Sequence, residues 1–281
     1  MKRIAALMMS ALLLFGCAGA EADIDITEIV DEIDLDAPVY GEAQWRFPVA
    51  LEDLNPEFII LANKHYLLEK GFYVKPLVEA KKLKLKKDGS VTSEGVRFAV
   101  GSSMKLQEDC WKALVALSDA ARADGYNLYL KSAYRSWQTQ NTMYKNRLKR
   151  NKGKDDGWVS KAGASDHQTG LGCDVIPKSW IKASGMNSKM AKEPECQWMA
   201  EHCQEYGFII RYPEDKEDVT EINYEPWHLR YVGIPAATYI MENGLCLEEF
   251  VAELQEAIRQ FIADGGDPKL VEAFIQESTD E

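Results

Sequence analysis

Residues 165–174, SDHQTGLGCD, place a histidine and a carboxylate seven residues apart around two glycines. His167 and Asp174 offer an imidazole nitrogen and a carboxylate oxygen, which are donors that zinc accepts. A second histidine, His228, follows 54 residues after Asp174 in the sequence EPWH. Glu225 stands three residues before His228 and is free to act as a base. Two histidines, an aspartate and a free glutamate predict a metal-dependent hydrolase.

The segment after His167 predicts a tight turn followed by a strand. Gly170 and Gly172 allow the backbone to turn sharply or to approach another segment closely. Residues 173–176 are typical of a short buried strand. We therefore expect His167 on a loop and Asp174 on a strand.

The spacing of Glu225 and His228 requires an interruption in the backbone. Residues three apart in a regular strand point to opposite faces, so the two side chains would not face one metal ion. Pro226 lies between them and breaks the pattern. We expect Glu225 to approach the metal site while His228 binds the ion from a strand at 228–232. Catalytic zinc sites keep three protein ligands and one open position for water.

Two motifs with this spacing are shared with a known family: SxHxxGx(small)xD at 165–174 and ExWH at 225–228. They resemble the VanY-type D-alanyl-D-alanine carboxypeptidases, within the zinc peptidases that include lysostaphin-like enzymes and hedgehog domains. The resemblance extends over about residues 58–250 and includes the segments LANKHYLL, SAYRSWQTQ, GFIIRYP and NGLCLEEF. Gly172 stands where the family usually has alanine.

The resemblance implies removal of the C-terminal D-Ala from peptidoglycan stem peptides, with one zinc ion per chain. His167, Asp174 and His228 are the expected metal ligands. Glu225 is the expected base, which takes a proton from the attacking water and passes it to the leaving amine. No serine nucleophile is expected, because the chain has no G-x-S-x-G signature.

Three further residues are expected to contact the substrate. Arg135 follows a predicted strand, and its planar guanidinium would stabilise the oxyanion or hold the substrate carboxylate. The resemblance implies that Ser165 and Gln140 help to hold that carboxylate.

Other functions remain open at this stage. The same fold serves L,D-carboxypeptidases and wall endopeptidases, and hedgehog-like relatives are zinc-containing modules that bind without catalysis. The presence of both Glu225 and Arg135 favours catalysis. The choice between D,D and L,D specificity, a resistance or wall-maturation role, and the oligomeric state stay open.

The elements that must position these residues alternate between helix and strand. Helical spacing of apolar residues predicts a helix from about 111 to 125. A strand at 128–132 then leads to Arg135, and Ser136 caps the next helix, which carries Gln140. The polar stretch 145–156 predicts a surface loop.

Later segments complete an α+β fold, a small antiparallel sheet with flanking helices that holds the zinc site. A helix is expected at 194–206 and a strand at 208–212. Helical periodicity at 247–263 and 268–276, separated by two glycines, predicts a helical C-terminal extension.

The N-terminal region predicts export. Two basic residues precede an apolar run typical of a signal peptide, expected over 1–20, and Cys17 ends a lipobox-like sequence. An acidic tether is expected at 21–50, a zinc carboxypeptidase domain at 51–250 and the extension at 251–281. We expect a protein held at the membrane by a lipid on Cys17, or otherwise secreted.

Charge and cysteine content limit the partners. The formal charge of −12 over 281 residues argues against nucleic acid as a ligand. Five cysteines remain if Cys17 is lipidated, and the sequence leaves their pairing open. They are Cys110, Cys173, Cys196, Cys203 and Cys246.

Overall fold

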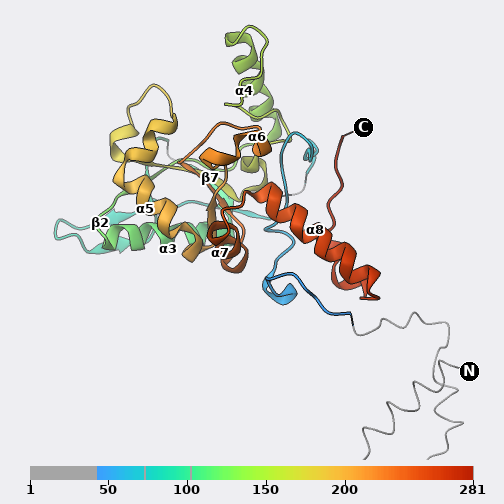
Figure 1. Cartoon of the computed structure of the whole chain (residues 1–281). Coiled ribbons are helices and arrows are strands. Elements are labelled where there is room, and N and C mark those ends of the chain that lie inside the picture. Colours follow the sequence, from blue (N-terminus) through green and yellow to red (C-terminus); the bar gives the residue numbers. More distant parts are fainter. Residues whose placement is uncertain (1–42, 73, 102, 281) are drawn as a thin grey trace, which may run out of the picture. The chain divides into compact units, whose positions relative to one another are not determined.

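The strand that carries Asp174 lies at the centre of a five-stranded sheet. The computed structural model describes residues 43–72, 74–101 and 103–280 (Figure 1). The expected signal peptide with Cys17, and the tether before residue 43, lie outside the described residues. In order across the sheet, the strands are β4 (Arg97–Phe98), β6 (Leu128–Ser132), β7 (Gly172–Pro177), β9 (His228–Tyr231) and β8 (Phe208–Ile210).

The predicted α+β fold is confirmed, with one difference in the sheet. Strands β6, β7, β9 and β8 pair antiparallel, as expected, while the short edge strand β4 runs parallel to β6. Every residue of β7 is buried, because the strand is covered on both faces. Burial on both faces is typical of a central strand.

Strand register brings the candidate ligands together. Asp174 of β7 lies opposite His228 of β9 and opposite Ser132 of β6. Residues directly opposite one another on antiparallel strands project to the same face of the sheet. The segments 167–174 and 225–228 therefore meet over one end of β7.

The helices and the smaller sheets surround this core. The α-helices are α3 (Glu108–Ala123), α4 (Trp137–Arg150), α5 (Pro194–His202), α6 (Glu217–Thr220), α7 (Ile234–Glu242) and α8 (Leu247–Ala263). Two strand pairs lie outside the main sheet: β1 (Leu77–Glu79) with β5 (Lys105–Gln107), and β2 (Lys84–Leu85) with β3 (Val91–Ser93). None of the described helices is long and apolar enough to cross a membrane.

Several 3-10 turns connect these elements. They are η1 (Leu51–Asp53), η2 (Asp166–Thr169), η3 (Lys178–Trp180), η4 (Ser188–Lys192), η5 (Cys203–Tyr206), η6 (Glu214–Lys216), η7 (Pro268–Leu270) and η8 (Glu272–Phe274). His167 therefore lies in a short turn, η2, rather than in an irregular loop.

The expected loop at 145–156 is wrong over its first half, because α4 continues to Arg150. Ser136 caps the start of α4 through a bond from the Thr139 amide, as predicted. Three basic residues occupy its last turn, where the negative end of the helix dipole favours positive charge. The polar composition of this stretch predicts a loop, but its residues have good helix propensity and continue the helix.

The C-terminal region also differs from the expected helical pair. The first helix, α8, is present, but residues 268–276 form only the 3-10 turns η7 and η8. Helix α8 begins at Leu247, before the expected boundary at 251, and its buried side chains join an apolar cluster that includes Phe47 and Ile209. All five described cysteines are buried and free of disulfides.

Gly170 gives a direct test of the turn that presents His167. It ends η2 with φ of 75°, and a Cβ there would lie 2.6 Å from Leu77 Cδ2. Gly170→Ala should lower the free energy of unfolding by about 1–3 kcal/mol, because both backbone strain and a clash are introduced. Urea denaturation measures the change.

Gly125→Ala is the matched control for this prediction. Gly125 has φ of 92°, but a Cβ there would meet no atom within 4 Å. It should therefore show the backbone strain alone and a smaller loss. Equal losses in the two variants would show that close packing at Gly170 contributes nothing.

Candidate metal centre and active site

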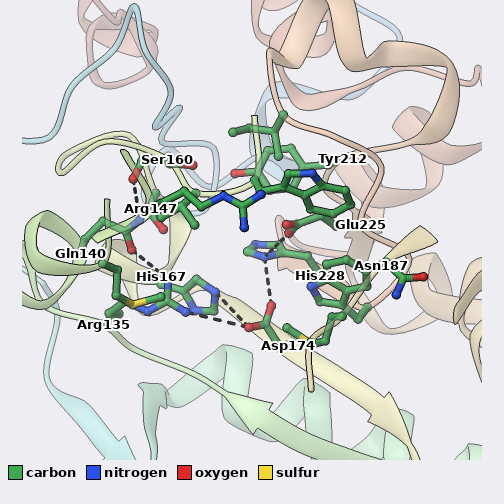
Figure 2. Close-up of a pocket in the computed structure, with 18 of the residues that line it drawn as sticks. Arg135, Gln140, Arg147, Ser160, His167, Asp174, Asn187, Tyr212, Glu225 and His228 are labelled. Carbon is green, nitrogen blue, oxygen red and sulfur yellow. Dashed lines mark hydrogen bonds and ion pairs between the residues drawn. The ribbon is translucent and has the colours of Figure 1, made fainter. Parts of the chain in front are cut away.

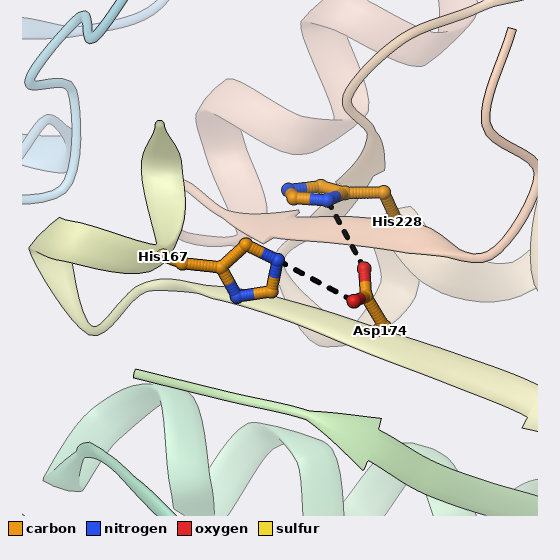
Figure 3. A group of neighbouring side chains, drawn as sticks. All are labelled: His167, Asp174 and His228. Atoms are coloured by element: carbon orange, nitrogen blue, oxygen red, sulfur yellow. Dashed lines mark ion pairs between the residues drawn. The ribbon is translucent and has the colours of Figure 1, made fainter. Parts of the chain in front are cut away.

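Three ligand atoms converge over the end of β7. One atom from each of His167, Asp174 and His228 lies within 4.8 Å of the others, and all three residues are buried. Figure 3 shows both imidazole rings next to the Asp174 carboxylate, each joined to it by a dashed line. The three residues come from η2, β7 and β9. The pairing of β7 with β9 therefore brings together residues that are far apart in the sequence.

A backbone carbonyl fixes the tautomer of His167. Its Nδ1 donates to Ala133 O at 2.7 Å, since a carbonyl can only accept. The Nε2 atom is then left unprotonated and faces Asp174 Oδ2 at 3.5 Å. Burial lowers the pKa of His167, and the nearby charge of Arg135 lowers it further, against the opposing effect of Asp174. The neutral imidazole is the form that binds metal.

His228 presents its other ring nitrogen to the same place. Its Nδ1 lies 3.2 Å from Asp174 Oδ1, and its Nε2 lies 3.9 Å from Asp166 Oδ2 on the far side. In the part of the chain that the structure describes, buried His228 Nε2 has no hydrogen-bond partner, so no protein contact there fixes which ring nitrogen carries the proton. Tyr212 packs against the ring with centroids 5.1 Å apart, which limits its rotation.

These donors fit a zinc ion. Within the described residues, buried Asp174 Oδ1 has no hydrogen-bond partner. Burial opposes ionisation of Asp174, but a proton on either neighbouring histidine outweighs it and lowers the pKa of the carboxyl. An ionised carboxylate and two imidazoles with inward-facing nitrogens make a three-ligand set of the catalytic type.

Glu225 lies beside this set, as the turn at Pro226 allows. Its backbone carbonyl accepts from the His228 amide at 3.1 Å, and its Oε2 lies 3.5 Å from His228 Nδ1. Burial raises the pKa of Glu225 well above its usual value, and the charge of Asp174 raises it further, against the effect of Arg135. A carboxylate with a raised pKa holds a proton more readily, as a general base requires.

Arg135 reaches the site from the segment after β6. Its Nη2 donates to Ser132 Oγ at 3.0 Å and lies 3.9 Å from Asp174 Oδ2. Its Nη1 donates to Gln140 Oε1 at 2.8 Å. Gln140 in turn donates from Nε2 to Ser160 O at 2.6 Å, so it links Arg135 to the Ser160 segment and retains one amide hydrogen for a ligand.

A cavity of about 490 Å³ opens over these groups (Figure 2). Ser165 lines it, and its side chain makes no capping bond to the turn that it precedes. Trp227 stacks on Trp158 with the ring planes 11° apart, and both residues line the cavity. The cavity is therefore polar around the candidate ligands and has an aromatic wall.

A buried charge network lies beneath the site. Arg211 donates from Nε to Asp166 Oδ2 at 2.7 Å, and Arg230 Nη1 donates to Asp166 Oδ1. Arg211 also makes a two-pronged contact with Glu248, with both distances 2.7 Å. Side chains of Asp166, Arg211 and Arg230 are 0% exposed. We call these four residues the buried charge network.

Sequence reasoning assigned none of these four residues a role. Burial alone would raise the pKa of Asp166, but the two arginines outweigh it and lower the pKa. Asp166 therefore stays ionised beside His167 and behind the ring of His228. In the sequence, the position of Asp166 between the motif residues Ser165 and His167 is the signal that points to it. Its two arginine partners lie 45 and 64 residues away and give no local signal.

The donor set, the adjacent buried carboxylate and the cavity define a metal-dependent hydrolase. Comparison with known proteins gives the family. A sequence profile of the VanY family, described as D-alanyl-D-alanine carboxypeptidase, matches residues 103–234. The putative carboxypeptidase YodJ of Bacillus subtilis (strain 168) is 34% identical over 207 residues, which cover 72% of this chain and 70% of YodJ.

Two solved structures agree with that assignment. The structure of the LdcB LD-carboxypeptidase aligns with a TM-score of 0.59 and 35% identity, over 70% of this chain and 87% of that one. A mutant of the vancomycin resistance D,D-pentapeptidase VanY in complex with Zn(II) aligns with a TM-score of 0.51 and 29% identity, over 69% and 99%. The chain belongs to the VanY family of D-alanyl-D-alanine carboxypeptidases and is an enzyme of the carboxypeptidase class.

The buried charge network predicts a large effect from a single neutralised carboxylate. Glu248→Gln should lower the free energy of unfolding by about 3 kcal/mol, because it removes one of the two carboxylates that compensate buried Arg211. Urea denaturation of the purified protein measures the loss.

Glu256→Gln on the same helix is the control. Glu256 pairs with Arg259, and both side chains are exposed, so the loss should stay below about 1 kcal/mol. A loss at Glu248 no larger than that at Glu256 would mean that Arg211 does not depend on this partner.

Proposed function

We propose that this chain is a zinc-dependent carboxypeptidase that releases the C-terminal D-Ala of peptidoglycan stem peptides, with D,D specificity. The observation that carries the proposal is the convergence of His167, Asp174 and His228 within 4.8 Å, with Glu225 Oε2 3.5 Å from His228. The VanY structure in complex with Zn(II) supports the choice of metal. One zinc ion per chain matches the single donor set found within the described residues.

The roles of the residues follow from their positions. A zinc ion held by the three ligands would polarise the scissile carbonyl and acidify the attacking water. Glu225 takes the proton of that water and returns it to the leaving amine, which its raised pKa favours. The buried position of Glu225 keeps competing bulk water away from the proton transfer.

Arg135 is the residue that binds the negative charge of the substrate. The guanidinium is held by Gln140 and Ser132, so its position is set before the substrate binds. It stabilises the oxyanion that develops at the carbonyl or holds the substrate carboxylate. Ser165 lines the same cavity and offers a hydroxyl to that carboxylate.

The three alternatives receive different support. An L,D-carboxypeptidase is the second candidate, because the LdcB LD-carboxypeptidase aligns with a higher TM-score than the D,D-pentapeptidase. A wall endopeptidase has no separate observation in its favour. A module that binds without catalysis would not need Glu225 buried beside the ligand set.

The metal and the base can be separated by substitution. His167→Ala, Asp174→Ala and His228→Ala should each lose the bound zinc. Glu225→Gln should keep one zinc per chain and lose about 10²–10⁴-fold in hydrolysis rate. Elemental analysis and D-Ala release are the two measurements.

Glu221→Gln is the control for this test, because Glu221 is exposed and pairs with Lys64 outside the cavity. It should keep both zinc and activity. Near-normal hydrolysis by zinc-loaded Glu225→Gln would remove Glu225 from the role of base.

Specificity is tested with two defined substrates. A D,D-enzyme accommodates the methyl group of a penultimate D-Ala, whereas an L,D-enzyme accepts a long L-diamino acid side chain. We expect a higher kcat/KM for D-Ala release from a pentapeptide stem than from a tetrapeptide stem. Some cross-activity is expected, because one small apolar group discriminates by only about 1–3 kcal/mol. A tetrapeptide preference of about tenfold or more would select the L,D alternative.

We also propose that the protein is exported and held at the membrane by a lipid on Cys17. The support is the basic and apolar leader followed by a lipobox-like sequence. The wild-type protein should partition with membranes, whereas Cys17→Ala should be released or remain unprocessed. A mature N-terminus at Glu21 in the native host would exclude the lipid anchor and indicate a secreted protein.

A further inference from the structure

A second cavity adjoins the metal-site cavity along α4. It has a volume of about 330 Å³, and its walls are formed by Met143, Asn146, Lys149, Arg150 and Val159. Three of these residues, Met143, Arg150 and Val159, also line the metal-site cavity. The two cavities are therefore parts of one groove, which we call the α4 groove where it leaves the site.

One face of α4 forms the wall that runs from the site to this groove. Gln140, Met143, Arg147 and Arg150 all line the metal-site cavity, and their spacing places them on one side of a helix. Arg150 follows ten residues after Gln140, which corresponds to about 15 Å along the helix axis. An extended peptide of about four to five residues covers the same length.

The outer end of the wall carries positive charge without a partner. Arg147 is paired with Asp156 in a two-pronged contact, and Lys64 lies 3.5 Å from Asp155. Within the described residues, Arg150 and Lys149 make no ion pair or side-chain hydrogen bond, although the chain as a whole carries a charge of −12. Figure 1 shows this end of α4 directed away from the sheet.

We propose that Arg150, assisted by Lys149, binds a free carboxylate on the part of the substrate that precedes the scissile bond. This inference rests on the proposed function. A carboxypeptidase substrate has only one residue beyond the scissile bond, so a groove of this length has to accommodate the preceding residues. Arg150 lies about 15 Å from Gln140 along the axis, and a helical side chain leans toward the helix N-terminus, so Arg150 meets a residue about three to four positions before that bond.

The chemistry of the groove defines the substrate class. A guanidinium prefers a carboxylate, which it can grip with two parallel hydrogen bonds. Met143 is 37% exposed and, with Val159, gives an apolar floor for the intervening peptide. A stem peptide whose second residue is γ-linked D-glutamate has a free α-carboxylate in this range. The corresponding isoglutamine peptide carries an uncharged amide there.

Basic residues at a helix C-terminus also stabilise the helix itself. A purely structural effect would change the stability of α4 and would alter the cleavage of the acid and amide peptides equally. Discrimination between the acid and the amide is therefore the property that separates ligand binding from a structural role.

The test uses the zinc-loaded full chain and two pentapeptide stems that differ only in γ-D-glutamate or γ-D-isoglutamine at the second residue. Wild-type protein should cleave the acid form with a kcat/KM about tenfold higher, mainly through KM. Arg150→Gln should bring that ratio close to one, because it removes the group that distinguishes the acid from the amide. For the wild-type protein, the acid-to-amide ratio of kcat/KM should decrease as the salt concentration is raised from about 0.05 to 0.5 M. Salt screens the interaction because the subsite is exposed.

Lys145→Gln is the matched control, since Lys145 lies on the same helix and lines neither cavity. It should keep the wild-type ratio. Equal cleavage of the two peptides by wild-type protein, or an unchanged ratio in Arg150→Gln, would overturn the subsite while leaving the carboxypeptidase function in place. Failure of wild-type protein to cleave either peptide, or the tetrapeptide stems with the same two second residues, would overturn both.

Discussion

The ion pairs around Asp166 are the constraint on which the catalytic end of the molecule depends. A fully buried carboxylate is tolerated only when positive groups compensate it, and Arg211 and Arg230 both do so. Arg230 also donates to the carbonyls of Phe58 and Ile60, and Arg211 reaches Glu248 on α8. The charge of Asp166 therefore links η2, the strands β8 and β9, the segment 58–60 and the helix α8.

This buried charge network gives the C-terminal helix α8 a structural role at the site. α8 shares no residue with the cavity, yet Glu248 in its first turn completes the charge balance beneath the ligands. Its apolar side chains pack in the cluster that contains Ile209 of β8. The helix thus supports the candidate metal centre and is not an appendage beside it.

The sequence predicted the parts of the site that depend on local rules. The ligand positions followed from residue chemistry and spacing, and the strands that carry Asp174 and His228 followed from apolar runs and the break at Pro226. The buried charge network could not be predicted in this way, because Asp166 and its arginines are 45 and 64 residues apart and charged residues are usually exposed. The face shared by Gln140, Met143, Tyr144 and Leu148 predicts a helix to Leu148, whereas the polar composition of 145–156 predicts a loop. The structure resolves this overlap in favour of the helix, which ends at Arg150.

The distance along the chain between the ligands has a consequence for how the protein folds. The β7–β9 pairing joins strands whose ligands are 54 residues apart, and His167 needs the Ala133 carbonyl 34 residues before it. Non-local contacts of this kind require the closure of long loops, which slows folding and gives little return until the closure is complete. We therefore expect the ligand set to assemble late in folding, so that a bound metal ion would stabilise the finished sheet rather than nucleate its formation.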